Sequence, residues 1–201
     1  MEGINNQQIF QTYVTPEEVN ELPLTSYGGK IVVVTDPRKI PEAVNEISQH
    51  EVVGFDTETK PTFKKGQFYH VSLIQIGIPN KVFLFRINKT GLTSDLKLLL
   101  SNEKILKLGV GLHDDIISLK KIEPFESAGF VELHHYVATM GVRNTGLRKL
   151  AAIILSIRIS KSQQTSNWDN ATLTENQLRY AATDAWVCLE MYNKLVATGF
   201  A

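Results

Sequence analysis

The sequence contains a single cysteine and no excess of either charge sign. One cysteine excludes an internal disulfide and a zinc site built from several cysteines. Cys188 lies among apolar residues of a helical pattern, so we interpret it as a small buried side chain. Lysine plus arginine equals aspartate plus glutamate, at 21 each. No global positive field therefore indicates nucleic-acid binding, although an acidic site that gathers divalent cations becomes locally positive.

Long apolar segments are lacking as well. No run approaches the roughly 20 apolar residues that cross a bilayer, and the polar N-terminus lacks the basic and apolar regions of a signal peptide. We therefore expect an intracellular, cytoplasmic protein with no membrane partner. The 201 residues suffice for one domain with a substantial core and are too few for two such domains.

The order of patterned segments predicts an α/β layer fold. Residues 1–29 are expected to form a loose N-terminal extension, and residues 30–201 a single domain. Strands are expected at residues 30–36, 51–58, 70–79, 81–87 and 104–111. Helices are expected at residues 41–50, 92–102, 112–122 and from about 174, and the chain beyond residue 131 is expected to be mainly helical. Strands first and alternating elements later indicate helices covering a mixed sheet.

The last predicted helix has a well-marked start. Thr174 and Gln177 fit a capping box, while a second frame beginning at Thr172 competes with it. Tyr180 and Asp184 follow beside the apolar stripe of this helix. Because they are four residues apart, their side chains share one facet of the helix.

Several acids lie where an apolar pattern predicts burial. Asp56 and Glu58 follow a strand-like apolar run, and residues two apart in a strand point to the same face, so their carboxylates repel each other. Asp115 falls on the inward stripe of its predicted helix, whereas Asp114 is explained by the helix dipole. Asp184 is the fourth such acid. A buried acid is costly unless it is paired or binds metal.

If these four acids surround one pocket, they form a site for divalent cations. Oxygen ligands without a matching histidine or cysteine cluster favour Mg²⁺ or Mn²⁺ over zinc. Sequence spacing alone leaves a second interpretation open, in which the acids serve separate ion pairs and helix caps.

Three ordered motifs resemble those of the DEDD (DnaQ-like) superfamily of 3′-to-5′ exonucleases: "FDTET", "KLGVGLHDD" and "NWDNATLTENQLRYAATDAW". The Tyr-x-x-x-Asp spacing of Tyr180 and Asp184 matches the DEDDy branch. Within that branch, the exonuclease domain of the Werner-syndrome helicase is most similar, and ribonuclease D is more distant. The matches include "VSLIQIG", "GVG", "FVEL" and "SNW", and the similarity covers residues 30–195.

The resemblance implies a ribonuclease H-like fold and a metal-dependent enzyme that releases nucleoside 5′-monophosphates from a 3′ end. Two cations, Mg²⁺ or Mn²⁺, would be held by Asp56, Glu58, Asp115 and Asp184. Asp56 would bridge both ions, Glu58 and Asp184 would complete one site, and Asp115 would support the other. Tyr180 would orient the nucleophilic water through hydrogen bonding, because an ordinary tyrosine is almost fully protonated at neutral pH.

The substrate side is less specific. Lys60, Lys64 and Lys65 alternate with aromatic residues directly after the first motif, and we interpret this loop as a guide for a single strand. A solvated loop with aromatic side chains tucked beneath it fits equally well. Arg148 and His113 are further candidates for contact with a substrate phosphate. Alternatively, Arg148 is one of the charges that helix ends often carry, and His113 caps a helix or lies on the surface.

Two departures qualify the resemblance. Gln163 and Gln164 stand where relatives often carry a basic residue, so one phosphate contact is in doubt. The second departure is an absence: no helicase segment or accessory RNA-binding domain fits this length. We therefore expect processivity to come from oligomerisation or from a partner in trans, such as a helicase or another repair protein.

Trp168, which belongs to the "SNW" match, is expected to pack in the core.

The favoured substrate is DNA with a free 3′ end. An RNA-trimming enzyme resembling ribonuclease D is one alternative, and a nucleic-acid-binding module that lost catalysis is another. Retention of all four acids and of Tyr180 argues against the inactive module.

Overall fold

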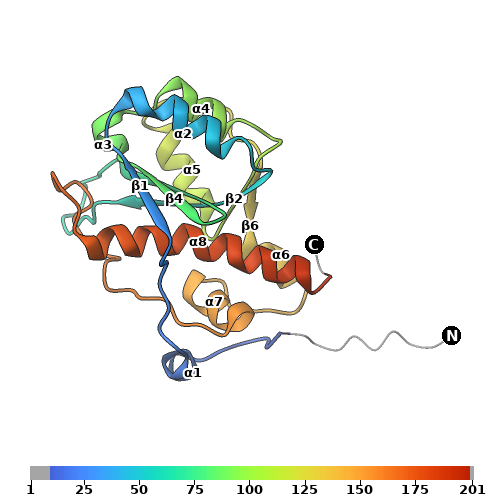
Figure 1. The fold of residues 1–201 in the computed structure, drawn as a ribbon. Coiled ribbons are helices and arrows are strands. Elements are labelled where there is room, and N and C mark those ends of the chain that lie inside the picture. Colours follow the sequence, from blue (N-terminus) through green and yellow to red (C-terminus); the bar gives the residue numbers. More distant parts are fainter. Residues whose placement is uncertain (1–9, 200–201) are drawn as a thin grey trace.

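A six-stranded mixed sheet lies at the centre of the computed structural model, which describes residues 10–199 (Figure 1). The strands are Lys30–Val34 (β1), Val52–Thr59 (β2), Val71–Ile78 (β3), Lys81–Phe85 (β4), Leu106–Gly109 (β5) and Phe130–Glu132 (β6). Their order across the sheet is β1-β4-β3-β2-β5-β6. β3 is antiparallel to β2 and β4, and the other neighbouring pairs are parallel. The expected mixed sheet is confirmed.

Helices cover both faces of this sheet (Figure 1). One face carries Ile40–Ile47 (α2), Ile87–Thr90 (α3), Ser94–Leu100 (α4) and Leu112–Lys120 (α5), with a short 3₁₀ turn at Pro37–Lys39. The long helix Glu175–Ala197 (α8) crosses the other face, and Leu147–Leu155 (α7) packs against it. Leu133–Ala138 (α6) and Pro16–Glu21 (α1) complete that side.

The alternation of β2 directs its side chains to two different layers. Val53 and Phe55 are fully buried in the core beneath α2, α4 and α5. Gly54, Asp56 and Glu58 fall on the opposite face, which α8 covers. The acidic pair therefore points away from the larger apolar core.

α8 approaches the sheet unusually closely at Ala185. The Cβ that an alanine would add at Gly54 lies 1.9 Å from the Ala185 carbonyl oxygen, and one added at Gly77 lies 3.3 Å from the Ala185 carbonyl carbon. Only glycine at position 54 leaves room for this contact. The close approach brings the neighbouring residue, Asp184, down to β2.

The start of α8 follows the frame expected from the sequence. Thr174 Oγ1 accepts from the Gln177 backbone N–H at 3.3 Å, and Gln177 Oε1 accepts from the Thr174 N–H at 3.0 Å. This reciprocal capping box fixes the helix start and excludes the competing frame at Thr172. Cys188, farther along α8, is 1% exposed, which confirms its buried role.

One strand was not expected. We predicted mainly helix beyond residue 131, but Phe130–Glu132 forms the edge strand β6, paired in parallel with β5. Three residues are too few to show an alternating pattern. This strand depends on its partner rather than on its own sequence.

The expectation of a loose N-terminal segment is wrong for residues 10–29. Thr15 and Glu18 form a capping box that starts α1, and Val19 within α1 is 1% exposed. Farther on, the Tyr27 backbone N–H donates to Thr183 Oγ1 at 2.9 Å. Residues 1–9 lie outside the described residues, and a domain boundary at residue 30 stays a prediction. Within residues 10–199, none of the helices has the length and apolar character of a membrane span.

Candidate metal centre

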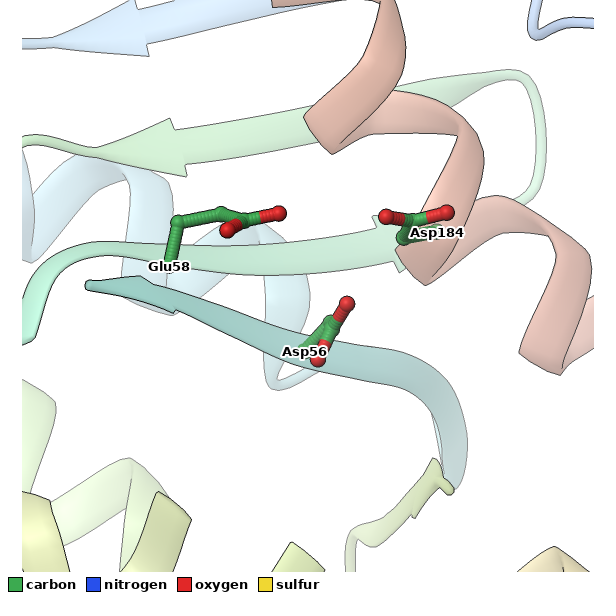
Figure 2. Close-up of side chains that lie close together, drawn as sticks. All are labelled: Asp56, Glu58 and Asp184. Carbon is green, nitrogen blue, oxygen red and sulfur yellow. The ribbon is translucent and has the colours of Figure 1, made fainter. Parts of the chain in front are cut away.

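Three carboxylates converge between β2 and α8. Carboxylate oxygens of Asp56, Glu58 and Asp184 lie within 4.8 Å of one another (Figure 2). β2 places the first two on one face because they are two residues apart, and α8 lowers the third onto them. The structure thus brings together three of the four acids predicted from the sequence.

Burial makes this cluster electrostatically unfavourable. Asp184 is only 4% exposed. Burial, followed by the charges of Asp184 and Asp115, raises the pKa of Asp56. Burial also raises the pKa of Glu58 and of Asp184, and the Asp56 charge adds to the shift of Glu58. The ionised cluster therefore needs a compensating positive charge.

The described part of the chain does not supply that charge. Among residues 10–199, the ion pairs join other side chains, and none of them includes Asp56, Glu58 or Asp184. Three oxygen ligands without a nitrogen or sulfur donor form the set that Mg²⁺ and Mn²⁺ prefer. The residues present therefore fit a divalent metal site.

Asp115 stands beside this group rather than within it. It belongs to α5 on the opposite face of the sheet, and Thr57 Oγ1 donates a hydrogen bond to Asp115 Oδ1 at 2.5 Å. Burial raises the pKa of Asp115, and this hydrogen bond opposes the shift. Asp115 is partly buried and Asp114 is exposed, as their helix positions predicted.

Glu132 is a supporting residue that sequence reasoning missed. Its Oε2 accepts the backbone N–H groups of Gly111 at 2.8 Å and of Leu112 at 2.9 Å. These groups form the start of α5, so a carboxylate on β6 fixes the helix that carries Asp115. The "FVEL" match included Glu132 but gave it no role, because β6 was not expected.

Tyr180 lies one helical turn before Asp184, and its hydroxyl interacts with the Asp184 carboxylate. Burial, followed by the charges of Asp184 and Glu58, raises the pKa of Tyr180, so its hydroxyl keeps its proton. Trp168 is fully buried, with its ring centre 6.0 Å from that of Tyr180. This confirms the core position expected for Trp168 and places it against the tyrosine.

A cavity of about 460 Å³ opens onto Tyr180 and Asp184. Its wall is basic: it includes Arg143, Arg148, Lys149 and Lys161. Among the described residues of the lining, Asp184 is the only acid. The cations of this lining would attract a polyanion, and Asp184 in the same lining belongs to the group of acids that fits a divalent metal.

Lys161 is relevant to the departure from the family pattern at Gln163 and Gln164. Gln164 lines the same cavity, where relatives were expected to place a basic residue, and Lys161 contributes positive charge nearby. Nothing in the local sequence distinguished Lys161 from an ordinary surface lysine. Only the fold brings it to the cavity.

The loop after β2 borders a second hollow, of about 340 Å³. Lys60 and Lys64 line it, and Lys65 is exposed. Phe63 is 84% exposed and Phe68 is 88% exposed, so the interpretation with these aromatic side chains tucked under the loop is wrong. A candidate on another element, His113, is exposed at the start of α5 and lines neither of the two hollows.

Comparison with known proteins agrees with this geometry. A family model described as 3′-5′ exonuclease matches residues 31–198. The chain belongs to this 3′-5′ exonuclease family. The resemblance stated from the sequence motifs is confirmed, and so is the expectation of an enzyme.

Named relatives of this exonuclease include the mouse (Mus musculus) bifunctional 3′-5′ exonuclease/ATP-dependent helicase WRN, 35% identical over 187 residues. Ribonuclease D of Haemophilus influenzae is 29% identical over 168 residues. These matches cover 88% and 81% of this chain but only 13% and 41% of the two relatives, so the exonuclease spans less than half of either.

Solved structures show the same fold. The exonuclease domain of Aedes aegypti Nibbler superimposes with a TM-score of 0.77, covering 87% of this chain and 94% of that domain at 24% identity. The expected ribonuclease H-like fold is therefore confirmed.

Proposed function

We propose that this exonuclease hydrolyses the terminal phosphodiester bond at a free 3′ end, with DNA as the favoured strand, and releases nucleoside 5′-monophosphates. The observation that carries the proposal is the convergence of Asp56, Glu58 and Asp184 beside a cavity with a basic wall. The acids give a metal site, and the wall gives a place for the phosphates of the strand.

Four carboxylates would hold two divalent cations, Mg²⁺ or Mn²⁺. Asp56, Glu58 and Asp184 form the converging group, and Asp115 supports it from the other face of the sheet. When bound, the cations would polarise the scissile phosphate and lower the pKa of a water molecule. The rigid pairing of β2 with β3 and β5 holds Asp56 in place for this purpose.

Tyr180 would position the attacking water rather than remove its proton. Its raised pKa keeps the hydroxyl protonated, and a protonated hydroxyl both donates and accepts hydrogen bonds. Packing against Trp168 and contact with Asp184 limit the directions in which the hydroxyl points. Orientation of a reactant is itself a large contribution to rate.

The strand would lie along the two hollows. Arg148 in the cavity would contact a phosphate, while Lys60, Lys64 and Lys65 would follow the backbone along the loop. The exposed rings of Phe63 and Phe68 offer stacking surfaces to bases, which is the usual way to hold a single strand. For His113, contact with a phosphate stays a prediction.

DNA is favoured because the chain is more similar to the exonuclease that is joined to a helicase than to ribonuclease D, at 35% against 29% identity. By the same argument we propose that a helicase or another repair partner acts with it in trans. An RNA-trimming enzyme is the alternative. A protein distinguishes RNA from DNA through contacts with the 2′-hydroxyl, so such contacts decide between the two enzymes.

The test uses matched DNA and RNA single strands labelled at the 5′ end, incubated with Mg²⁺, Mn²⁺ or EDTA. We expect a ladder that shortens from the 3′ end, abolished by EDTA and by Asp56→Asn, with DNA shortened faster. Asp114→Asn is the matched control, because Asp114 is an exposed aspartate next to Asp115.

Other results would redirect the assignment. Faster shortening of RNA would favour the trimming enzyme. Strand binding without cleavage by a folded protein that binds metal would favour the inactive module. Near-normal turnover by Asp56→Asn would contradict the proposed metal site.

A further inference from the structure

The N-terminal segment (residues 10–22) runs directly against the basic segment of the cavity (residues 143–149). The Arg143 backbone N–H donates to the Thr12 carbonyl at 2.7 Å, and the Val14 N–H donates to Asn144 Oδ1 at 2.8 Å. Asn144 is only 5% exposed, so its bond to Val14 is buried. Two hydrogen bonds two residues apart hold the segments in a defined register.

Side chains of the N-terminal segment also contact cations of the cavity. Asn20 Oδ1 accepts from Arg148 Nη2 at 2.5 Å, and the Lys149 ammonium lies 5.1 Å from the centre of the Tyr13 ring. Pro16 and Val19 line the same cavity. The N-terminal segment is therefore part of the cavity wall.

Asn20, the hydrogen-bond partner of Arg148, is uncharged and therefore leaves the positive charge of Arg148 uncompensated. A neutral carboxamide orients a guanidinium without cancelling it, whereas a carboxylate would form an ion pair and compete with any other anion. Arg148 Nε is buried and lacks a hydrogen-bond partner among the described residues, so this guanidinium keeps an unpaired donor. Val19 of α1 is 1% exposed, so apolar packing also anchors this helix.

We propose that the N-terminal segment is a positioning element of the nuclease site, and that Asn20 holds Arg148 ready to bind a phosphate of the substrate strand. Asn20 is a positioning residue, since it acts through Arg148 and does not itself touch the strand. This inference rests on the proposed function, because it takes the cavity to be the path of that strand.

The experiment compares Asn20→Ala, Asn20→Asp, Arg148→Ala and the Asn20→Ala/Arg148→Ala double variant in the full chain. Binding of a fluorescent single-stranded DNA is measured by anisotropy in EDTA over a range of salt concentrations. Values of kcat and KM are measured separately with Mn²⁺. Asn193→Ala and Asn193→Asp make the same chemical changes at an exposed site near the far end of α8 and serve as matched controls.

We expect Arg148→Ala to weaken binding about tenfold, the effect of one charge-assisted hydrogen bond, and to lower the salt slope by about one. Asn20→Asp should raise KM more than Asn20→Ala, because its carboxylate neutralises Arg148. In both Asn20 variants kcat should change less than twofold. The double variant should bind no worse than Arg148→Ala, because Asn20 acts only through that residue.

Additive effects in the double variant would overturn the proposal. So would Asn20 variants that bind like their Asn193 counterparts, or that lower kcat and melting temperature while leaving KM unchanged. If Arg148→Ala binds normally while the wild type still cleaves 3′ ends, this inference and the Arg148 phosphate contact are wrong, but the proposed exonuclease reaction stands. If the wild type neither binds nor cleaves any strand, both are wrong.

Discussion

Burial disfavours the ionised form of each of the three converging carboxylates, and the negative charges of the neighbouring acids add to this cost. Asp184 is buried next to two other acids, and the described residues offer none of the three an ion pair. Replacing one carboxylate with a neutral amide therefore removes repulsion as well as a proposed metal ligand. Stability and activity should respond to such a change in opposite directions.

For Asp184→Asn we expect the metal-free melting temperature to rise by about 2–4 °C, the shift that 1 kcal/mol produces in a chain of this size. The further rise that Mn²⁺ gives the wild type should be lost. Turnover should fall at least about a hundredfold, since charge stabilisation by metal contributes several kcal/mol and each 1.36 kcal/mol is a factor of ten. Thermal melts with and without Mn²⁺ measure the first two effects. An unchanged Mn²⁺ shift would contradict the ligand role.

Tyr180→Phe separates positioning from metal binding. The ring still packs against Trp168, but the hydroxyl next to Asp184 is gone. We expect kcat to fall about 10- to 100-fold, the range of effects seen when a reactant loses its orientation. The Mn²⁺-induced shift in melting temperature should be retained. Loss of that shift would show that Tyr180 supports the metal site instead.

At the level of secondary-structure elements, the contact between β2 and α8 sets the geometry of the site. Gly54 and Ala185 meet there, and Ala185 directly follows Asp184 along α8. For Gly54→Ala we expect α8 to be displaced from β2, with a loss of about 1–3 kcal/mol in the free energy of unfolding, as overpacking usually costs. Activity should fall although Gly54 carries no functional group.

Gly28→Ala is the matched control for that variant, because an added Cβ at Gly28 would meet no atom within 4 Å. Chemical denaturation gives the free energies of unfolding, and the oligonucleotide assay gives the activities. If Gly54→Ala keeps both wild-type values, the close approach does not determine the position of Asp184.

The elements that sequence predicted correctly are those that carry their own signals. β2 and β3 show long apolar runs, and Thr174 with Gln177 marks the start of α8. β6 and α1 were missed because three and six residues are too few to display a period. Their structure comes from partners that lie far away along the chain, such as β5 and α7.

For the whole molecule, the difference between local sequence signals and contacts made only by the fold also explains how much of the site could be predicted. The acids stood out singly, since each interrupts an apolar pattern. Arg148 of the basic wall was also among the candidates predicted from the sequence, but Lys161 and the N-terminal segment were not, because they reach the wall only through the fold. The separation of Asp115 from the other three acids was also hidden, because it depends on which face of the sheet α5 covers.

Limited proteolysis with chymotrypsin tests the packing of the whole chain. Phe63 and Phe68 are exposed on a loop, whereas Tyr27 is 4% exposed within the N-terminal part. We expect the first cuts after Phe63 and Phe68, and none after Tyr27 until the protein unfolds, since cleavage requires local opening. Mass spectrometry of the fragments identifies each cut.

Bound single-stranded DNA should slow the cuts after Phe63 and Phe68, because stacked bases would cover these rings. A duplex with blunt ends serves as the comparison. Early cleavage after Tyr27 would contradict the packing of residues 10–29. Equal loop cleavage with and without the single strand would argue against the loop as a strand guide.

The joining of β2 to α8 has a consequence for biosynthesis. Asp56 leaves the ribosome early, but Asp184 belongs to the last helix, which also closes one face of the sheet. A nascent chain adds about 5–20 residues per second, so the polypeptide exists for some seconds with Asp56 and Glu58 but without Asp184. Any chain whose synthesis stops before α8 lacks both Asp184, a proposed metal ligand, and Tyr180. The proposed metal site is therefore complete only after α8 has been synthesised and has docked on the sheet.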